Sequence, residues 1–180
     1  MIIGLWSHTD RWMIDKGTLV DPGDAFYLLH PLQVLLISGL IIWWSCRSCD
    51  HRVKARMLII ACSGLLILTI LELIFKTILH QPAGSLPTDA YGVHLSFSYP
   101  SGHAARLGFM ISLGMILLPR CLIPPTVIIG IIFMLLLFLS AIHYPSDLIG
   151  GALLGMIIGT VTAETVQTLG QNKPAAPVEE

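Results

Sequence analysis

Two short stretches of the sequence place a histidine beside a proline–serine pair at the edge of a long apolar run. They are residues 98–103 (SYPSGH), which contain His103, and residues 140–147 (SAIHYPSD), which contain His143 and Asp147. A histidine side chain acts either as a nucleophile or as a general acid that protonates a leaving oxygen. A carboxylate beside a nucleophilic histidine fixes its tautomer and raises its basicity. The pattern therefore predicts His143 as nucleophile, Asp147 as its orienting acid and His103 as general acid.

Residues suited to binding a phosphate group lie in the same regions. Lys76 lies near the end of an apolar run, and Arg106 lies about one helical turn after the first histidine stretch. Ser101 and Gly102 would begin a helix, whose free backbone N–H groups bind anions, and glycine lets an anion approach the backbone. Arginine adds planar donors for phosphate oxygens. Glu72 can pair with Lys76 four residues later, and two interpretations stay open: a buried structural ion pair, or a group that positions Lys76.

The composition is that of a membrane protein. Apolar residues make up 54% of the 180 residues, charged residues only 12%, and the mean hydropathy is +0.79. A soluble domain has about 25% charged residues. The net charge of −1 says nothing about partners, but the sequence has no basic stripe for nucleic acid, and the expected partners are membrane lipids and a lipid phosphate. We expect one membrane-embedded domain over residues 1–170 and a disordered cytoplasmic tail over residues 171–180.

Five apolar runs approach the roughly 20 residues that cross a bilayer. Residues 1–24 mix tryptophans with charged residues and predict a helix that lies in the interface or forms a sixth span. The expected fold class is therefore all-α: a polytopic membrane helical bundle with five firm transmembrane spans plus this N-terminal helix. The five runs are residues 25–46, 57–79, 104–118, 122–142 and 148–166.

Three glycines at four-residue spacing, Gly151, Gly155 and Gly159, lie in the last of these runs. Small residues at this spacing let the backbones of two membrane helices approach closely. We therefore expect these glycines to serve helix packing.

Lysine and arginine are distributed unevenly between the connecting segments. The segment between the first two runs carries Arg47, Arg52, Lys54 and Arg56, and the turn after the third run carries Arg120. The segments at residues 80–100 and 143–147 contain neither residue type. Basic loops stay in the cytoplasm. The bias therefore predicts that both histidine stretches lie on the non-cytoplasmic side.

The histidine stretches resemble the second and third motifs of the type 2 phosphatidic acid phosphatase family. Its superfamily also includes the bacterial acid phosphatases and the vanadium haloperoxidases. The resemblance rests on Pro-Ser-Gly-His at residues 100–103 and on His143 with Asp147, and Lys76 resembles the lysine that opens the first motif. It covers about residues 70–160. It implies a bundle of six helices and a metal-independent mechanism with no cofactor.

The resemblance also implies a role for each matching residue. The match of His143 forms a phosphohistidine, the match of His103 protonates the leaving oxygen, and the match of Asp147 orients the nucleophile. Water then releases phosphate. The phosphoryl oxygens would be held by the matches of Lys76, Ser101 and Gly102.

The sequence departs from the family pattern at two places. Ala83 and Gly84 stand where the first motif has Arg-Pro, and Leu136 and Leu137 stand where the third motif opens with Ser-Arg. Two phosphate-binding guanidinium groups are therefore missing. We expect Arg106 to substitute for them, with His80 and Gln81 as further contributors. The departures leave an inactive relative open as an interpretation.

These observations predict an integral-membrane lipid phosphatase, in a bacterial inner membrane with its active site on the non-cytoplasmic side. Its substrate would be a lipid phosphate or diphosphate monoester: undecaprenyl diphosphate, phosphatidylglycerol phosphate, phosphatidate or a lipid A phosphate. One alternative is a phosphotransferase, in which an alcohol replaces water. The other is a non-catalytic binder or transporter of lipid phosphates. No metal site is predicted, because nothing completes a ligand set with Cys46 and Cys49.

Overall fold

Helices account for most of the chain that the computed structural model describes, namely residues 31–45, 50–79, 99–139 and 143–171. These residues form five α-helices and one short 3-10 helix, η1, which confirms the all-α expectation. The elements are α3 (Pro31–Ser45), α4 (His51–Leu79), α5 (Gly102–Leu117), η1 (Arg120–Leu122), α6 (Ile123–Leu139) and α7 (Pro145–Gln171).

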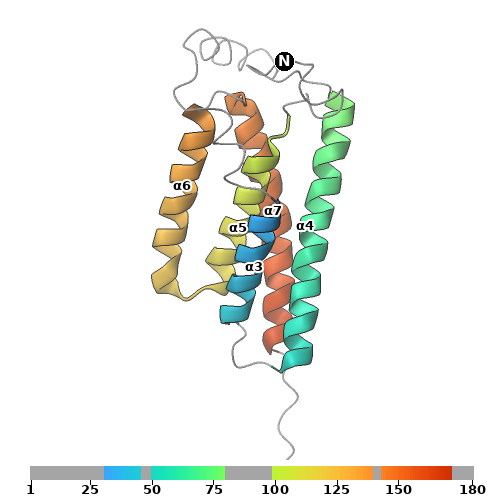
Figure 1. Ribbon diagram of the computed structural model, residues 1–180, viewed down its shortest axis with the longest axis vertical. Helices are drawn as coiled ribbons and strands as arrows, with labels where there is room; N and C mark the ends of the chain where they lie inside the picture. The colour runs from blue at the N-terminus through green and yellow to red at the C-terminus, as the bar shows by residue number, and fades with distance from the viewer. Residues whose placement is uncertain (1–30, 46–49, 80–98, 140–142, 172–180) are drawn as a thin grey trace, which may run out of the picture.

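The α-helices form a bundle around α5, which contacts each of the other four. Helix α7 runs along α5, α4 packs mainly against α7, α3 lies against α5 and α4, and α6 lies at the edge of the bundle (Figure 1). The C-terminal ends of α4 and α6 lie at the same end of the bundle as the N-terminal ends of α5 and α7 (Figure 1). Residues that flank these four termini are therefore gathered at one end of the molecule.

The closest approach in the bundle is between α5 and α7. A Cβ atom added at Gly155 would overlap the carbonyl oxygen of Ala105, and one added at Gly159 would lie 2.7 Å from that of Phe109. A Cβ at Gly151 would likewise overlap the carbonyl oxygen of Ser101. The three glycines of α7 thus lie against successive turns of α5. The predicted role of these glycines in close helix packing is confirmed.

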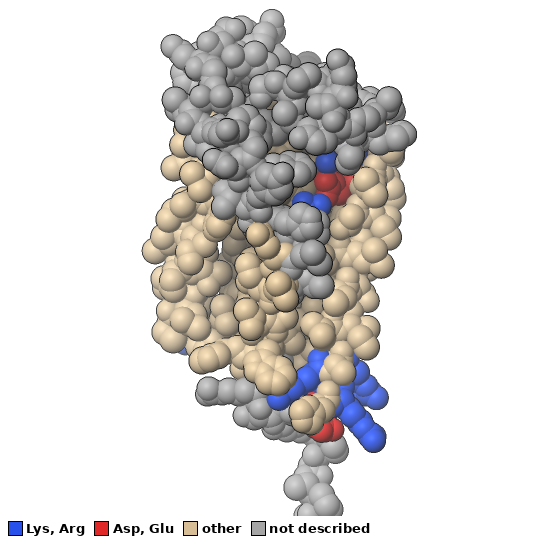
Figure 2. Space-filling model, viewed as in Figure 1, with Lys and Arg blue, Asp and Glu red and all other residues tan. Residues whose placement is uncertain are grey.

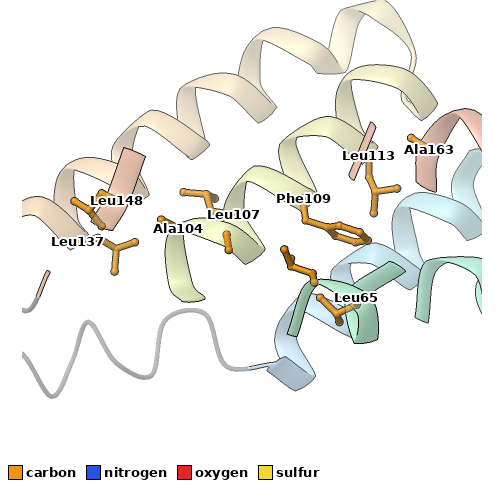
Figure 3. Packing of buried hydrophobic residues seen from close by; sticks show 10 residues of the cluster. Leu65, Ala104, Leu107, Phe109, Leu113, Leu137, Leu148 and Ala163 are labelled. Atoms are coloured by element: carbon orange, nitrogen blue, oxygen red, sulfur yellow. The ribbon is translucent and has the colours of Figure 1, made fainter. Parts of the chain in front are cut away.

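Buried apolar side chains fill the space between the helices, as Figure 3 shows around Phe109 and Leu113. Large apolar side chains also cover the outside, and Ile59 and Ile131 are each more than 60% exposed. A soluble helix would turn a polar face to water. An apolar exterior on an apolar interior is what lipid requires. The buried cluster is Leu65, Leu68, Ala104, Ala105, Leu107, Phe109, Leu113, Leu137, Leu148 and Ala163.

Three stretches are long and apolar enough to cross a membrane within the described part of the chain, and they suggest an integral membrane protein. They are His51–Leu79, Arg120–Leu139 and Pro145–Gly170. Helix α5, with 16 residues, is apolar but shorter. Helix α3 has 15 residues and corresponds to the later part of the first expected run. The full set of five spans therefore remains a prediction. The expected N-terminal helix lies outside the described residues.

Several helices begin before the apolar runs that predicted them. Helix α4 begins at His51 rather than at residue 57, and the carboxylate of Asp50 accepts the N–H of His51 at 2.7 Å. Helix α7 begins at Pro145, a residue suited to the first helical turn because its missing N–H is not needed there. It also ends one residue inside the expected tail, at Gln171. Hydropathy marks the lipid-facing part of a helix, whereas capping groups set where its hydrogen bonds begin and end.

We expect Gly155→Ala to destabilise the protein, because the new methyl group would meet the backbone of α5 at Ala105. Overpacking of this kind costs about 1–3 kcal/mol. The measurement is the melting temperature of the purified protein in detergent. Ile157→Leu, at an exposed position of the same helix, is the matched control. An unchanged melting temperature for Gly155→Ala would contradict the close helix contact.

Candidate active site

The chemically distinctive residues lie at one end of the bundle, where α4 ends and α5 and α7 begin (Figure 1). Lys76 is in the last turn of α4, and His103 is the second residue of α5. His143 lies two residues before α7, and Asp147 is the third residue of that helix. Ser101 is the N-cap of α5, and its hydroxyl oxygen accepts the N–H of Ala104 at 3.4 Å.

The rings of the two histidines lie close together. Their centroids are 6.0 Å apart, and the ring planes make an angle of 50°. His103 is carried by α5 and His143 by the turn before α7, so the contact between α5 and α7 sets this distance. Two imidazoles at this separation can both reach one small group between them.

Main-chain hydrogen bonds fix the two histidine stretches to each other. The N–H of Ser101 donates to the carbonyl oxygen of Asp147 at 3.0 Å, which joins the start of α5 to the start of α7. The N–H of Tyr144 donates to the carboxylate of Asp147, also at 3.0 Å. A carboxylate three residues into a helix that accepts the N–H of the N-cap residue is half of a capping box. Asp147 therefore holds the peptide that directly follows His143.

This capping contact of Asp147 was not predicted from the sequence. The signal was available, because Tyr144 precedes a proline at the first helical position and lies three residues before an acid. The predicted contact was with the ring of His143 instead. The buried Nδ1 atom of that ring makes no hydrogen bond to any residue that the structure describes. The orienting role of Asp147 toward the ring remains a prediction.

A compact ionic group lies beside the histidines. The Nζ atom of Lys76 is 2.8 Å from one carboxylate oxygen of Glu72, and a guanidinium nitrogen of Arg106 is 3.5 Å from the other. Glu72 is only 6% exposed. Acidic and basic atoms meet near one end of the bundle, within a largely uncharged surface (Figure 2). One carboxylate thus joins a cation of α4 to a cation of α5.

Gly102 lies directly against this ionic group. A Cβ atom at Gly102 would be 2.6 Å from the carboxylate carbon of Glu72. The sequence predicts that this glycine lets an anion approach the backbone. The structure gives a further reason, because only glycine leaves room for the Glu72 carboxylate at the first turn of α5. Nothing in the sequence indicated this contact between residues 30 positions apart.

The environment of His143 favours its neutral form. The residue lies in the turn between α6 and α7 and is half-buried. Burial lowers its pKa to about 3, and the nearby charges of His103 and Lys76 act in the same direction. The imidazole therefore keeps a free lone pair at neutral pH, as a nucleophile requires.

Of the two positions at which the family has an arginine, residues 83 and 137, the structure describes only residue 137. Leu137 is 2% exposed and belongs to the apolar core, so its place on α6 is filled by packing. Gln81, Ala83 and Gly84, together with His80, lie outside the described residues. Within the described ranges, no three histidine, cysteine or carboxylate side chains are grouped closely enough to hold a metal ion.

The fold and the site together define an all-α bundle of the membrane type with a histidine pair and an ionic group at one end. A protein-family model described as the PAP2 superfamily matches residues 57–171, which is more than half of the chain. The protein belongs to this superfamily, and the resemblance found in its motifs is confirmed. Membership suggests a phosphatase of the lipid phosphate phosphatase kind. Comparison with curated proteins and with solved structures gave no match.

The lowered pKa of His143 predicts how stability depends on pH. Between pH 6.5 and about 3, the unfolded chain binds a proton on this ring that the folded protein does not bind. The free energy of unfolding therefore falls as the pH falls through this window, by up to about 1.4 kcal/mol per pH unit. Above pH 6.5 both states leave the ring neutral, and the contribution is constant.

The measurement is the melting temperature of the wild type and of His143→Gln in detergent across this window. We expect acidification to lower the melting temperature less in His143→Gln than in the wild type. Equal losses would show that His143 is already free to take up a proton in the folded state.

Proposed function

We propose that the protein is an integral-membrane lipid phosphatase that hydrolyses a lipid phosphate or diphosphate monoester through a phosphohistidine, without a metal ion. The observation that carries the proposal is the His103–His143 pair, with ring centroids 6.0 Å apart, at the end of a bundle with long apolar helices. Membership of the PAP2 superfamily supports the reaction class. The substrates to consider are undecaprenyl diphosphate, phosphatidylglycerol phosphate, phosphatidate and lipid A phosphates.

In the first step, neutral His143 attacks phosphorus. An N–P bond forms as the P–O bond to the leaving group breaks, and protonated His103 gives its proton to the departing oxygen. In the second step, His103 takes a proton from water as that water attacks phosphorus. The N–P bond breaks, phosphate leaves, and both histidines return to their starting protonation states. Asp147 supports His143 by accepting a hydrogen bond from the N–H of the next residue, Tyr144.

Lys76 and Arg106 are the cations that would hold the phosphoryl oxygens. They lie beside the same carboxylate, on α4 and α5 respectively. An ammonium group has three N–H donors and a guanidinium has five, so each retains donors for an anion while it contacts Glu72. The N-cap Ser101 and the first helical residue, Gly102, add the N-terminal end of α5 as a partial positive charge. We assign to Arg106 the role that the two missing family arginines would have played.

The arrangement in the membrane is part of the same proposal. The lipid tail would stay between apolar helices while the headgroup reaches the histidines, in a bundle of five or six spans. The first turns of α4, which carry Arg52 and Arg56, and η1, which carries Arg120, lie at the opposite end of the bundle from the starts of α5 and α7 (Figure 1). This charge distribution favours a site on the non-cytoplasmic side of a bacterial inner membrane.

A non-catalytic binder of lipid phosphates is the second candidate, and the burial of Leu137 at a family arginine position favours it. The discriminating probe is orthovanadate, which adopts the pentacoordinate geometry of the reacting phosphorus. We expect vanadate to inhibit the wild type and to raise its melting temperature, and we expect His143→Ala to lose this rise because vanadate binds to His143. Binding of lipid phosphates without turnover and without stabilisation by vanadate would favour the binder.

The central prediction is metal-independent phosphate release. Purified protein in detergent with a chelator should release phosphate from at least one lipid of the panel. His143→Ala should abolish release, because His143 supplies the attacking lone pair in this mechanism. His103→Ala should lower kcat by about 10²–10⁴-fold, the usual contribution of a general acid. Release that persists in His143→Ala would exclude the phosphohistidine.

A separate prediction concerns Arg106. Loss of a charged hydrogen-bond donor costs about 1.5–3 kcal/mol. Arg106→Ala should therefore raise KM by about tenfold or more and slow the reaction. Arg120→Ala, at an exposed position in η1 at the opposite end of the bundle from the starts of α5 and α7 (Figure 1), is the control and should behave as the wild type. Equal kinetics of Arg106→Ala and wild type would show that Arg106 does not replace the missing arginines.

A further inference from the structure

Glu72 is a buried carboxylate for which the proposed chemistry assigns no task. It carries a negative charge beside a site that would bind an anion, which at first sight works against substrate binding. An isolated charge buried among apolar side chains is costly and persists only with partners. The partners that Glu72 has are Lys76 and Arg106.

The Glu72 side chain lies against three residues of the site, one on α4 and two on α5. One carboxylate oxygen lies 2.8 Å from the ammonium nitrogen of Lys76, and the other lies 3.5 Å from a guanidinium nitrogen of Arg106. A Cβ atom added at Gly102 would lie only 2.6 Å from the carboxylate carbon. The carboxylate therefore lies at the first turn of α5, next to the cations of two different helices.

An ion pair confined to α4 would need only the Glu72–Lys76 contact, which the four-residue spacing supplies within one helix. The additional contact with Arg106 crosses from α4 to α5. The absence of a side chain at residue 102 gives the carboxylate the room it occupies. The contact with Arg106 and the space at Gly102 bring Lys76 and Arg106 together. A buried ion pair within α4 would require neither the contact nor the space.

Without the carboxylate, the two cations would repel each other in a medium of low dielectric constant. Each also has a long side chain with about 2 kcal/mol of rotamer entropy to lose on being held in place. Glu72 opposes the repulsion and restrains both side chains before any anion arrives. Two cations and one carboxylate leave a net charge of +1 in this group, so it still attracts an anion.

We propose that Glu72 is the positioning residue of the phosphate site, holding Lys76 and Arg106 at one point beside the start of α5. This inference rests on the proposed phosphatase function. It makes the Glu72 carboxylate the means by which Arg106, from α5, serves in place of arginines that the family carries elsewhere. Gly102 then has the role of leaving space for the Glu72 carboxylate.

The experiment uses the full-length protein in detergent and compares the wild type, Glu72→Gln, Arg106→Ala and the double variant. Glu164→Gln, an exposed carboxylate of α7, is the charge-matched control. The readouts are kcat, KM, the inhibition constant of inorganic phosphate, and the rise in melting temperature that inorganic phosphate produces.

We expect Glu72→Gln to raise KM and the phosphate inhibition constant by about tenfold, since a charged hydrogen-bond partner is lost, while kcat falls less. We expect Arg106→Ala to have a smaller effect in the Glu72→Gln background than in the wild type, because residues that act together are not additive. Glu164→Gln should match the wild type.

Three results would overturn the inference while leaving the phosphatase function intact. The first is a lower melting temperature for Glu72→Gln with unchanged KM and phosphate constant, which would make Glu72 a structural staple between α4 and α5. The second is tighter phosphate binding, which would make Glu72 a repelling group. The third is full additivity of the Glu72 and Arg106 substitutions. If Glu72→Gln does not fold, Glu72→Asp, which keeps the charge but shortens its reach, must show the same rise in KM relative to kcat.

The two proposals fail in different ways. A wild type that neither hydrolyses lipid phosphates nor is stabilised by inorganic phosphate would overturn both. A wild type that is stabilised by phosphate without hydrolysis would overturn the phosphatase alone. The loss of that stabilisation in Glu72→Gln would then support the positioning role by itself, and its persistence would overturn it.

Discussion

The direct contact between the backbones of α5 and α7 is the constraint on which the rest of the structure depends. Gly151, Gly155 and Gly159 have no side chains that would separate the two helices. The starts of both helices then meet, and Ser101 bonds to the backbone of Asp147. His103 and the turn that carries His143 are brought together by this contact. A helix pair at ordinary spacing, about 8–10 Å between axes, would hold the two rings further apart.

Charges in an apolar bundle must be balanced locally, and this requirement shapes the end of the molecule where the histidines lie. Glu72, Lys76 and Arg106 form one ionic group rather than separate pairs. Burying such a group is costly unless its members satisfy each other. The same contacts that offset this cost also restrain the two cations, so one set of contacts serves both stability and anion binding. Gly102 is needed for these contacts, because a side chain there would displace the Glu72 carboxylate.

The surroundings of His143 show how burial prepares a group for chemistry. Its lowered pKa reduces stability toward acid, because the folded protein resists a proton that the unfolded chain accepts. In return, the imidazole is neutral at ordinary pH. Asp147 anchors the next peptide through Tyr144, which restricts the turn without placing that hydrogen bond on the ring. Positioning and protonation are thus controlled by different contacts.

The sequence predicts the helical membrane class, the superfamily, the packing role of the glycines in α7 and the Glu72–Lys76 pair. Each depends on composition or on spacing within one helix, which the helical repeat fixes. It did not determine helix ends, because capping groups rather than hydropathy set them. Only the tertiary structure brought Arg106 to Glu72, put the Glu72 carboxylate against Gly102, buried Leu137 in the core and set 6.0 Å between the histidine rings. These contacts join residues far apart in the chain, and their geometry follows from how the helices pack, which no local pattern encodes.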